Sequence, residues 1–116
     1  AYSHKNDLME LINSLNNNGK KVAGYGASTK GNVILQFCNI TDKDLFGIAE
    51  VNQDKFGKYT PVSNIPIRSE ADIKSENPDY LLVLPWHFKD HIIKKEKKFL
   101  NSGGKLIFPL PEIEIV

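Results

Sequence analysis

The sequence has a single cysteine and no long apolar run, and each of these absences excludes a class of protein. Cys38 alone cannot build a disulfide framework or a cysteine-based zinc site within this chain. The longest apolar run, residues 80–84, is far too short to cross a bilayer, and no signal-peptide pattern precedes it. We therefore expect a cytoplasmic protein that does not associate with membranes.

Arginine and net charge are also scarce. Arg68 is the sole arginine among fifteen basic residues, and the net charge is +1. Such a balance creates no global field to attract nucleic acid, so no nucleic-acid partner is expected. Because lysine binds phosphate as a compact point charge, an anion site here would combine lysine with backbone amide groups.

Catalytic constellations are missing as well. No nucleophile–base pair, acid pair or metal cluster can be assembled from the sequence. His91 lies in a predicted helix without an acidic or cysteine partner at ligand spacing, and Cys38 follows an apolar helix; both are interpreted as structural. Read from its own residues, the chain binds but does not catalyse.

What the sequence does contain is an alternation of strands and helices within a length that fits one domain. The opening helix, capped by Asn6 and ended by Gly19, carries one apolar stripe, formed by Leu8, Leu11, Ile12 and Leu15. Short apolar segments predict five strands, at residues 21–26, 45–52, 65–69, 79–85 and 105–111. Further helices are expected from Ser28 to residue 38, from Ser69 to residue 77 and over residues 87–104, with a long loop at 53–65 and a tail after 111.

This alternation predicts an α/β fold, a Rossmann-like three-layer sandwich with helices on both faces of a mainly parallel sheet. The expected order of the five strands is 3-2-1-4-5, with Pro66 restricting the third to an edge. Residues 1–19 would be a connecting helix packed on the domain, and residues 20–116 the domain itself. In such sheets ligands bind beyond the carboxyl ends of the strands, where the order reverses. The loops after the first, second, fourth and fifth strands should therefore share one edge.

The loop after the first strand, "GYGASTKGN", has the features of an anion site. Gly24 and Gly26 allow a sharp turn, and the next residues present free amides at a helix start, where anions are stabilised. The alternative is that Ser28 merely caps the helix and the glycines serve packing. The predicted ligand contacts in this loop are Gly26, Ala27, Ser28, Thr29, Lys30 and Asn32.

Two features decide between a dinucleotide and another phosphate-bearing ligand. Glu50 ends the second strand, roughly where an acidic residue would bond a ribose. Thr29, however, replaces the third glycine of the G-x-G-x-x-G fingerprint, whose function is close packing of helix and strand, so we expect it to crowd the helix or the ligand. A stand-alone NAD-binding domain therefore remains as the alternative, and a purely structural packing module as a further one.

Two more loops carry candidate contacts. The second loop offers Asn52, Lys55, Lys58 and Tyr59 as a flap over phosphate, against the alternative of a solvated turn. The fourth strand is followed by Trp86, which could stack on a base or sugar, and by His87, which could donate to a phosphate. Their alternative is that Trp86 covers the sheet edge and His87 begins the next helix.

Four segments in order, "GYGASTKGN", "EVNQDKFGKYTP", "PDYLLVLPWHF" and "GGKLIFPLP", resemble the C-terminal domain of the S-adenosylmethionine-dependent sugar-nucleotide C-methyltransferases. The resemblance covers residues 20–111. It implies a longer enzyme with a zinc-binding domain, a central domain that holds S-adenosylmethionine and catalyses methyl transfer, and this third domain. The third domain would bind no cofactor and would help hold a nucleotide-diphosphate deoxysugar, so the isolated chain would be inactive. The predicted partners are this sugar nucleotide and the upstream methyltransferase domain.

Overall fold

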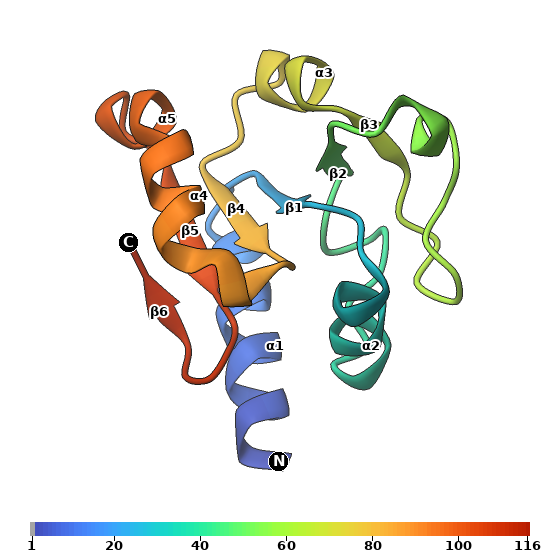
Figure 1. The fold of residues 1–116 in the computed structure, drawn as a ribbon. Helices are drawn as coiled ribbons and strands as arrows, with labels where there is room; N and C mark the ends of the chain where they lie inside the picture. Colours follow the sequence, from blue (N-terminus) through green and yellow to red (C-terminus); the bar gives the residue numbers. More distant parts are fainter. Residues whose placement is uncertain (1) are drawn as a thin grey trace.

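A six-stranded sheet runs through the centre of the computed structural model, which describes residues 2–116 (Figure 1). The strand order is β3-β2-β1-β4-β5-β6, and the first five strands in sequence pair in parallel. The predicted α/β class and the order 3-2-1-4-5 are confirmed. The strands are β1 (Val22–Tyr25), β2 (Ile48–Glu50), β3 (Ile67–Ser69), β4 (Tyr80–Val83), β5 (Lys105–Phe108) and β6 (Glu114–Ile115).

Helices cover both faces of this sheet. One face carries α1 (Tyr2–Asn17) and α2 (Thr29–Phe37), and the other carries α3 (Glu70–Ser75), α4 (Lys89–Lys95) and α5 (Lys97–Asn101) (Figure 1). Successive strand residues point to opposite faces, so the strands supply two separate cores. In β4, for example, Leu82 belongs to the core under α1 and α2, whereas Leu81 and Val83 belong to the core under α3 and α4. No helix within residues 2–116 has the length and apolar character needed to cross a membrane.

Most predicted helix ends are confirmed by their capping bonds. The Ser28 hydroxyl accepts a hydrogen bond from the Gly31 amide and starts α2, and Ser69 does the same for Asp72 at α3. Gly19, with φ of 76°, follows the end of α1. Asn6 was the wrong cap, because α1 already begins at Tyr2.

The single helix predicted over residues 87–104 is wrong. A 3-10 turn, η2 (Trp86–Phe88), precedes α4, and a break at Glu96 separates α4 from α5. Phe88, in this 3-10 turn, is turned outward and is 57% exposed. The break directs the Glu96 side chain into the protein, where the Tyr25 hydroxyl donates a hydrogen bond to it.

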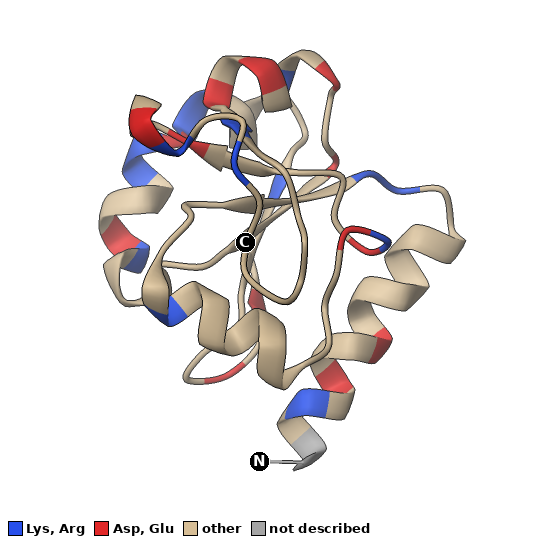
Figure 2. Ribbon diagram, turned by 90° about the vertical axis from the view of Figure 1, so that its right-hand side faces the viewer, with Lys and Arg blue, Asp and Glu red and all other residues tan. Residues whose placement is uncertain are grey.

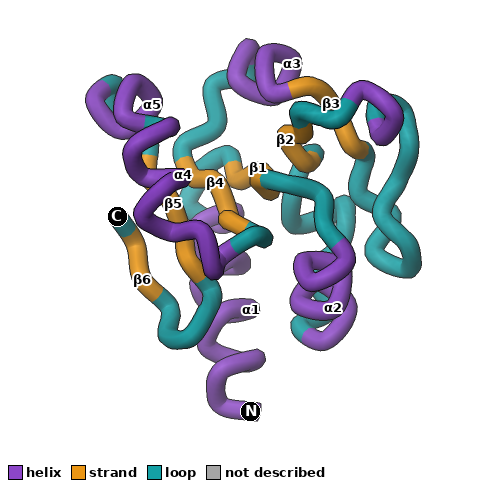
Figure 3. The backbone as a smooth tube through the Cα atoms, in the orientation of Figure 1, coloured by secondary structure: helices purple, strands orange, loops and turns teal. Residues whose placement is uncertain are grey.

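Two other segments differ from expectation. The second strand is confined to residues 48–50, because Leu45 closes a turn onto the Thr41 carbonyl instead of pairing with β1. The tail forms β6, antiparallel to β5, since residues 109–113 loop back along the edge of the sheet. The loop between β2 and β3 contains a short 3-10 helix, η1 (Gln53–Lys55), and runs outside the sheet edge (Figure 3).

Candidate functional site

The carboxyl ends of β1, β2 and β4 border a cleft of about 200 Å³. It lies at the predicted reversal of strand order, between β1 and β4, where such sheets bind ligands. Its floor is the end of β1 and its sides come from α3, α4 and the residue after β2. The residues lining it include Tyr25, Gly26, Glu50, Val51, Glu70, Pro85, Phe88, His91 and Lys95.

The β1–α2 turn is packed tightly against the segment that follows β4. Gly26 has φ of 82°, and a β-carbon there would lie 2.8 Å from Pro85 Cδ. A β-carbon at Gly31 would lie 2.6 Å from Leu84 Cβ, so Gly31 is the residue that lets α2 approach the sheet. Thr29 is exposed at the helix start. The expected crowding of the helix by Thr29 is therefore wrong, since Gly31 performs the packing role that we assigned to that position; crowding of a ligand by Thr29 stays a prediction.

The start of α2 presents backbone donors without protein partners. Ala27 donates its amide to Glu50, and Gly31 donates to Ser28. Within residues 2–116 no acceptor takes the amides of Ser28, Thr29 or Lys30. Three unpaired N–H groups at a helix start, beside an exposed lysine, form a favourable environment for an anion. Asn32 is half-buried one turn further, with its amide bonded to the Ser28 carbonyl.

Glu50 is buried and ties two loops together. One carboxylate oxygen accepts from the Ala27 amide at 2.9 Å, and the other accepts from the amides of Val51 and Asn52 at 2.9 and 2.8 Å. Three backbone bonds fix this side chain as a support for the turn. The predicted use of Glu50 on a ribose would require it to give up part of this network, so the geometry argues against the dinucleotide alternative.

The β2–β3 loop reaches the same turn through one lysine. Lys55 Nζ lies 2.6 Å from the Ala27 carbonyl, which places a second cation beside the start of α2. Asn52 caps η1, where its side chain accepts from the Asp54 amide. Lys58 and Tyr59 are exposed further along, and Tyr59 forms an isolated bridge with Pro66 towards the β3 edge. The structure thus brings Lys55 to the turn, while Tyr59 belongs to a separate part of the surface.

The aromatic segment after β4 lies on the rim. Trp86 is half-buried and its ring meets that of His87 edge to face at 5.6 Å. His87 is exposed, and its ring lies tilted against that of Phe88, which lines the cleft, with 4.3 Å between the ring centroids. Since Pro85 contacts Gly26, this segment and the β1–α2 turn are neighbours at one edge, as predicted. Their roles as ligand contacts remain predictions.

Two polar side chains of α4 on the opposite wall were not predicted as site residues. His91 was interpreted as structural, but it is exposed and lines the cleft. Lys95 also lines the cleft; it forms an ion pair with Glu70 at 3.2 Å and lies 5.5 Å above the Tyr25 ring. The i, i+4 spacing of His91 and Lys95 places both on one face of α4, and this is the signal that could have found them.

A buried network lies just below the cleft. Tyr25 donates to one oxygen of Glu96 at 2.9 Å, and Lys74 Nζ pairs with the other at 2.5 Å. Desolvation by burial, with the hydrogen bond to Glu96 next in importance, raises the pKa of the Tyr25 phenol far above its ordinary value. The network joins α3 to the α4–α5 break across the end of β1.

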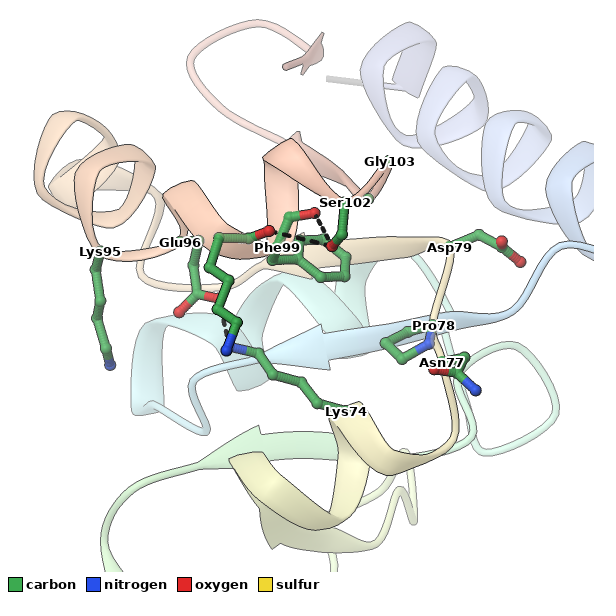
Figure 4. Close-up of a pocket in the computed structure, with 11 residues that line it drawn as sticks. Lys74, Asn77, Pro78, Asp79, Lys95, Glu96, Phe99, Ser102 and Gly103 are labelled. Atoms are coloured by element: carbon green, nitrogen blue, oxygen red, sulfur yellow. Dashed lines mark hydrogen bonds and ion pairs between the residues drawn. The ribbon is translucent and has the colours of Figure 1, made fainter.

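A larger groove of about 700 Å³ continues from this network towards the amino ends of β4 and β5 (Figure 4). Two of its three lysines, Lys74 and Lys95, already form ion pairs with Glu96 and Glu70. The groove opens away from the edge where parallel sheets bind ligands, so the smaller cleft is the better candidate.

The residues described here do not fit a zinc site. Cys38 is buried in the core under α2, as predicted, and burial raises the pKa of its thiol. No group of three or more His, Cys, Asp or Glu side chains within residues 2–116 is placed to hold a metal ion.

Comparison with known proteins agrees with this architecture. Residues 1–111 match the family described as C-methyltransferase C-terminal domain. The chain is also 38% identical over 109 residues to the C-methyltransferase NovU of Streptomyces niveus, an alignment that covers 94% of this chain and 26% of NovU. The chain therefore spans about a quarter of the length of that relative. A match over nearly every residue of the domain, including all four loops at the carboxyl edge, means that this chain belongs to the C-methyltransferase C-terminal domain family.

Proposed function

We propose that this domain helps hold the nucleotide end of a nucleotide-diphosphate deoxysugar in a longer, cytoplasmic, S-adenosylmethionine-dependent C-methyltransferase. The proposal is supported above all by the three unpaired amides of Ser28, Thr29 and Lys30 at the start of α2. They lie at the carboxyl edge of the sheet, with the Lys55 ammonium held beside them. A diphosphate would accept hydrogen bonds from the amides and be neutralised by the two lysines.

In this proposal the domain binds the sugar nucleotide, and other parts of the longer enzyme catalyse the reaction. The turn supplies binding groups, and no group of three or more His, Cys, Asp or Glu side chains within residues 2–116 is placed to hold a metal ion. Methyl transfer and the binding of S-adenosylmethionine and zinc are therefore assigned to other parts of the longer enzyme. The name of NovU, a C-methyltransferase, supports the reaction class.

The kinetic test uses Lys30→Ala in the longer enzyme. Losing a charged phosphate contact of about 1.5–3 kcal/mol should raise the KM for the sugar nucleotide about tenfold or more. Thr29→Ala tests a hydroxyl contact, because the Thr29 side chain bonds nothing else within residues 2–116. Ser28→Ala is less informative, since it also removes the cap of α2 and about 1 kcal/mol of stability.

Lys105→Ala is the matched control, because Lys105 is an exposed lysine at the amino end of β5, the opposite edge of the sheet. Its KM should equal that of the wild type. If Lys30→Ala and Thr29→Ala both leave the KM unchanged, the domain does not hold the diphosphate at this turn and the proposal fails.

A further inference from the structure

A face formed by two segments without charged residues lies beside the proposed phosphate site, and its composition sets it apart from the rest of the molecule. Residues 31–41 and residues 59–67 contain no Lys, Arg, Asp or Glu, although 25% of the chain is charged. Figure 2 views the side of α2 and of the β2–β3 loop, and the ribbon there is largely tan. We call this surface, formed by Val33, Gln36, Phe37, Pro61 and Val62, the α2 face.

The two stretches form one surface because hydrogen bonds join them. Gln36 Nε2 donates to the Pro61 carbonyl at 3.3 Å, and directly after the first stretch the backbone amide of residue 42 donates to the Ser63 carbonyl at 3.2 Å. Large apolar side chains on this surface point into solvent: Val33 is 64% exposed, Phe37 49% and Val62 85%. Depletion of charge around exposed apolar groups is typical of the centre of a protein–protein interface.

The backbone at the loop tip supports a role for this exposure. Val62 has φ of 68°, a value that is a genuine outlier for a β-branched residue. The amide of Ser63 donates to the Pro61 carbonyl at 2.7 Å and closes a tight turn around Val62. Glycine or asparagine would suit this turn better in a free surface loop, so a valine there is best explained by a contact that uses its side chain.

The position of the first helix identifies what covers the α2 face. Lys5 Nζ lies 5.6 Å above the Phe37 ring, and His4 lines the same apolar cavity as Phe37 and Ile34. A polypeptide that leads into α1 therefore arrives next to this face. NovU has about three quarters of its length outside the region that aligns with this chain. Lys30 lies on the same outer side of α2, so an occupant of the face would also border the proposed phosphate site.

We infer that the α2 face is the docking surface for the preceding, methyltransferase part of the same enzyme, which would complete the ligand site over the start of α2. The inference rests on the proposed function, because it requires that the domain belongs to a longer methyltransferase. A second copy of this chain is the competing occupant.

Hydroxyl-radical footprinting tests this assignment in the longer enzyme and in the 116-residue chain. Val33, Phe37 and Val62 should be labelled about tenfold more slowly in the longer enzyme, as expected for side chains in an interface core. Ile115, which is 47% exposed on β6 at the far edge of the sheet, is the matched control and should be labelled equally in both. Equal labelling of the α2 face in both proteins would overturn the inference.

A binding experiment separates the occupants. The preceding part of the enzyme, produced separately, should bind the 116-residue chain, and Val62→Asp or Val33→Glu should weaken this binding about 10–100-fold. Aspartate tolerates positive φ better than valine does, so Val62→Asp should fold as well as the wild type. Ile115→Asp should bind as the wild type does.

Each remaining outcome is decisive. A chain that forms a dimer by itself, and loses it with Val62→Asp, would identify a second copy as the occupant and overturn the inference. Normal binding by both α2-face variants would do the same. Neither experiment needs a sugar nucleotide, so the two proposals can fail separately. Docking at the α2 face without binding of a sugar nucleotide would uphold the inference and contradict the proposed function. Binding of a sugar nucleotide without docking at the α2 face would uphold the proposed function and contradict the inference.

Discussion

The buried pair of Tyr25 and Glu96 stabilises the end of β1, directly beside the candidate site. Tyr25 is the last residue of β1, directly before Gly26, and its hydroxyl is held by a carboxylate that is 2% exposed. Because Lys74 neutralises the same carboxylate, the end of β1 is tied to α3 as well as to the α4–α5 break. Removing one member leaves a buried polar atom without its partner, which costs more than the hydrogen bond itself.

Tyr25→Phe should therefore lower the free energy of unfolding by about 1.5–3 kcal/mol, the range for a hydrogen bond to a charged group. Urea denaturation of both proteins measures the difference. Tyr59→Phe is the control, since Tyr59 is exposed and its hydroxyl has no partner within residues 2–116. Equal stability of Tyr25→Phe and Tyr59→Phe would show that the network adds nothing to the fold.

The same phenol predicts a loss of stability at high pH. Burial, and then the bond to Glu96, raises the pKa of Tyr25, so the folded protein keeps this proton where the unfolded chain, with a pKa of about 10, loses it. The contribution of Tyr25 to the free energy of unfolding is fully present well below about pH 10, the pKa of the unfolded chain. As the pH rises through about 10, this contribution decreases by up to about 1.4 kcal/mol per pH unit. The stability difference between wild type and Tyr25→Phe should shrink between about pH 9 and about pH 11. A constant difference would contradict a raised pKa.

At the scale of the elements, α2 can lie close to the sheet because Gly31 has no side chain. A β-carbon at Gly31 would meet Leu84 Cβ at 2.6 Å, and neither atom is the flexible end of a side chain. Gly31→Ala gains about 1 kcal/mol of helix propensity but overpacks the contact at a cost of about 1–3 kcal/mol.

Gly31→Ala should therefore fail to stabilise the protein, and it should weaken ligand binding because α2 and its free amides move. Thermal unfolding and ligand titration measure the two effects. Val33→Ala, on the exposed side of the same helix, should change the free energy of unfolding by less than about 0.5 kcal/mol. A clear gain in stability for Gly31→Ala would show that α2 is less tightly packed than the structure indicates.

The strand order and the capping residues Ser28 and Ser69 could be predicted from the sequence because they depend on local pattern and on the handedness of crossovers. The buried position of Glu96 could not, because it depends on a helix break within "KKEKK", whose composition is that of a solvated face. The packing role of Gly31 was also not predicted, because the G-x-G-x-x-G fingerprint places its third glycine at position 29, two residues earlier. At the site, the i, i+4 spacing of His91 and Lys95 predicts that they share one face of a helix, but which face points into the cleft depends on the 3-10 turn η2 before α4, which the sequence pattern did not predict.

At the scale of the whole molecule, the proposed function gives this domain a role in binding and places methyl transfer in other parts of the longer enzyme. Purified 116-residue chain should transfer no methyl group from S-adenosylmethionine to a sugar nucleotide, because the proposed function places the binding of S-adenosylmethionine and the acid–base groups in other parts of the longer enzyme. A methyl-transfer assay with labelled S-adenosylmethionine checks this, with the longer enzyme as the positive control. Sustained turnover by the chain alone would show that catalytic groups within it have been overlooked.

The central claim is that a diphosphate is held at the start of α2, and amide chemical shifts of the 116-residue chain test it most directly, since they report even weak binding. During titration with a nucleotide-diphosphate sugar, the amides of Ser28, Thr29 and Lys30 should shift progressively and saturate, while those of β6 should not move. Lys30→Ala should weaken this response, and NAD should produce a smaller one. Shifts that centre on the groove near Lys98 and Ser102, or no shifts at all, would contradict the account.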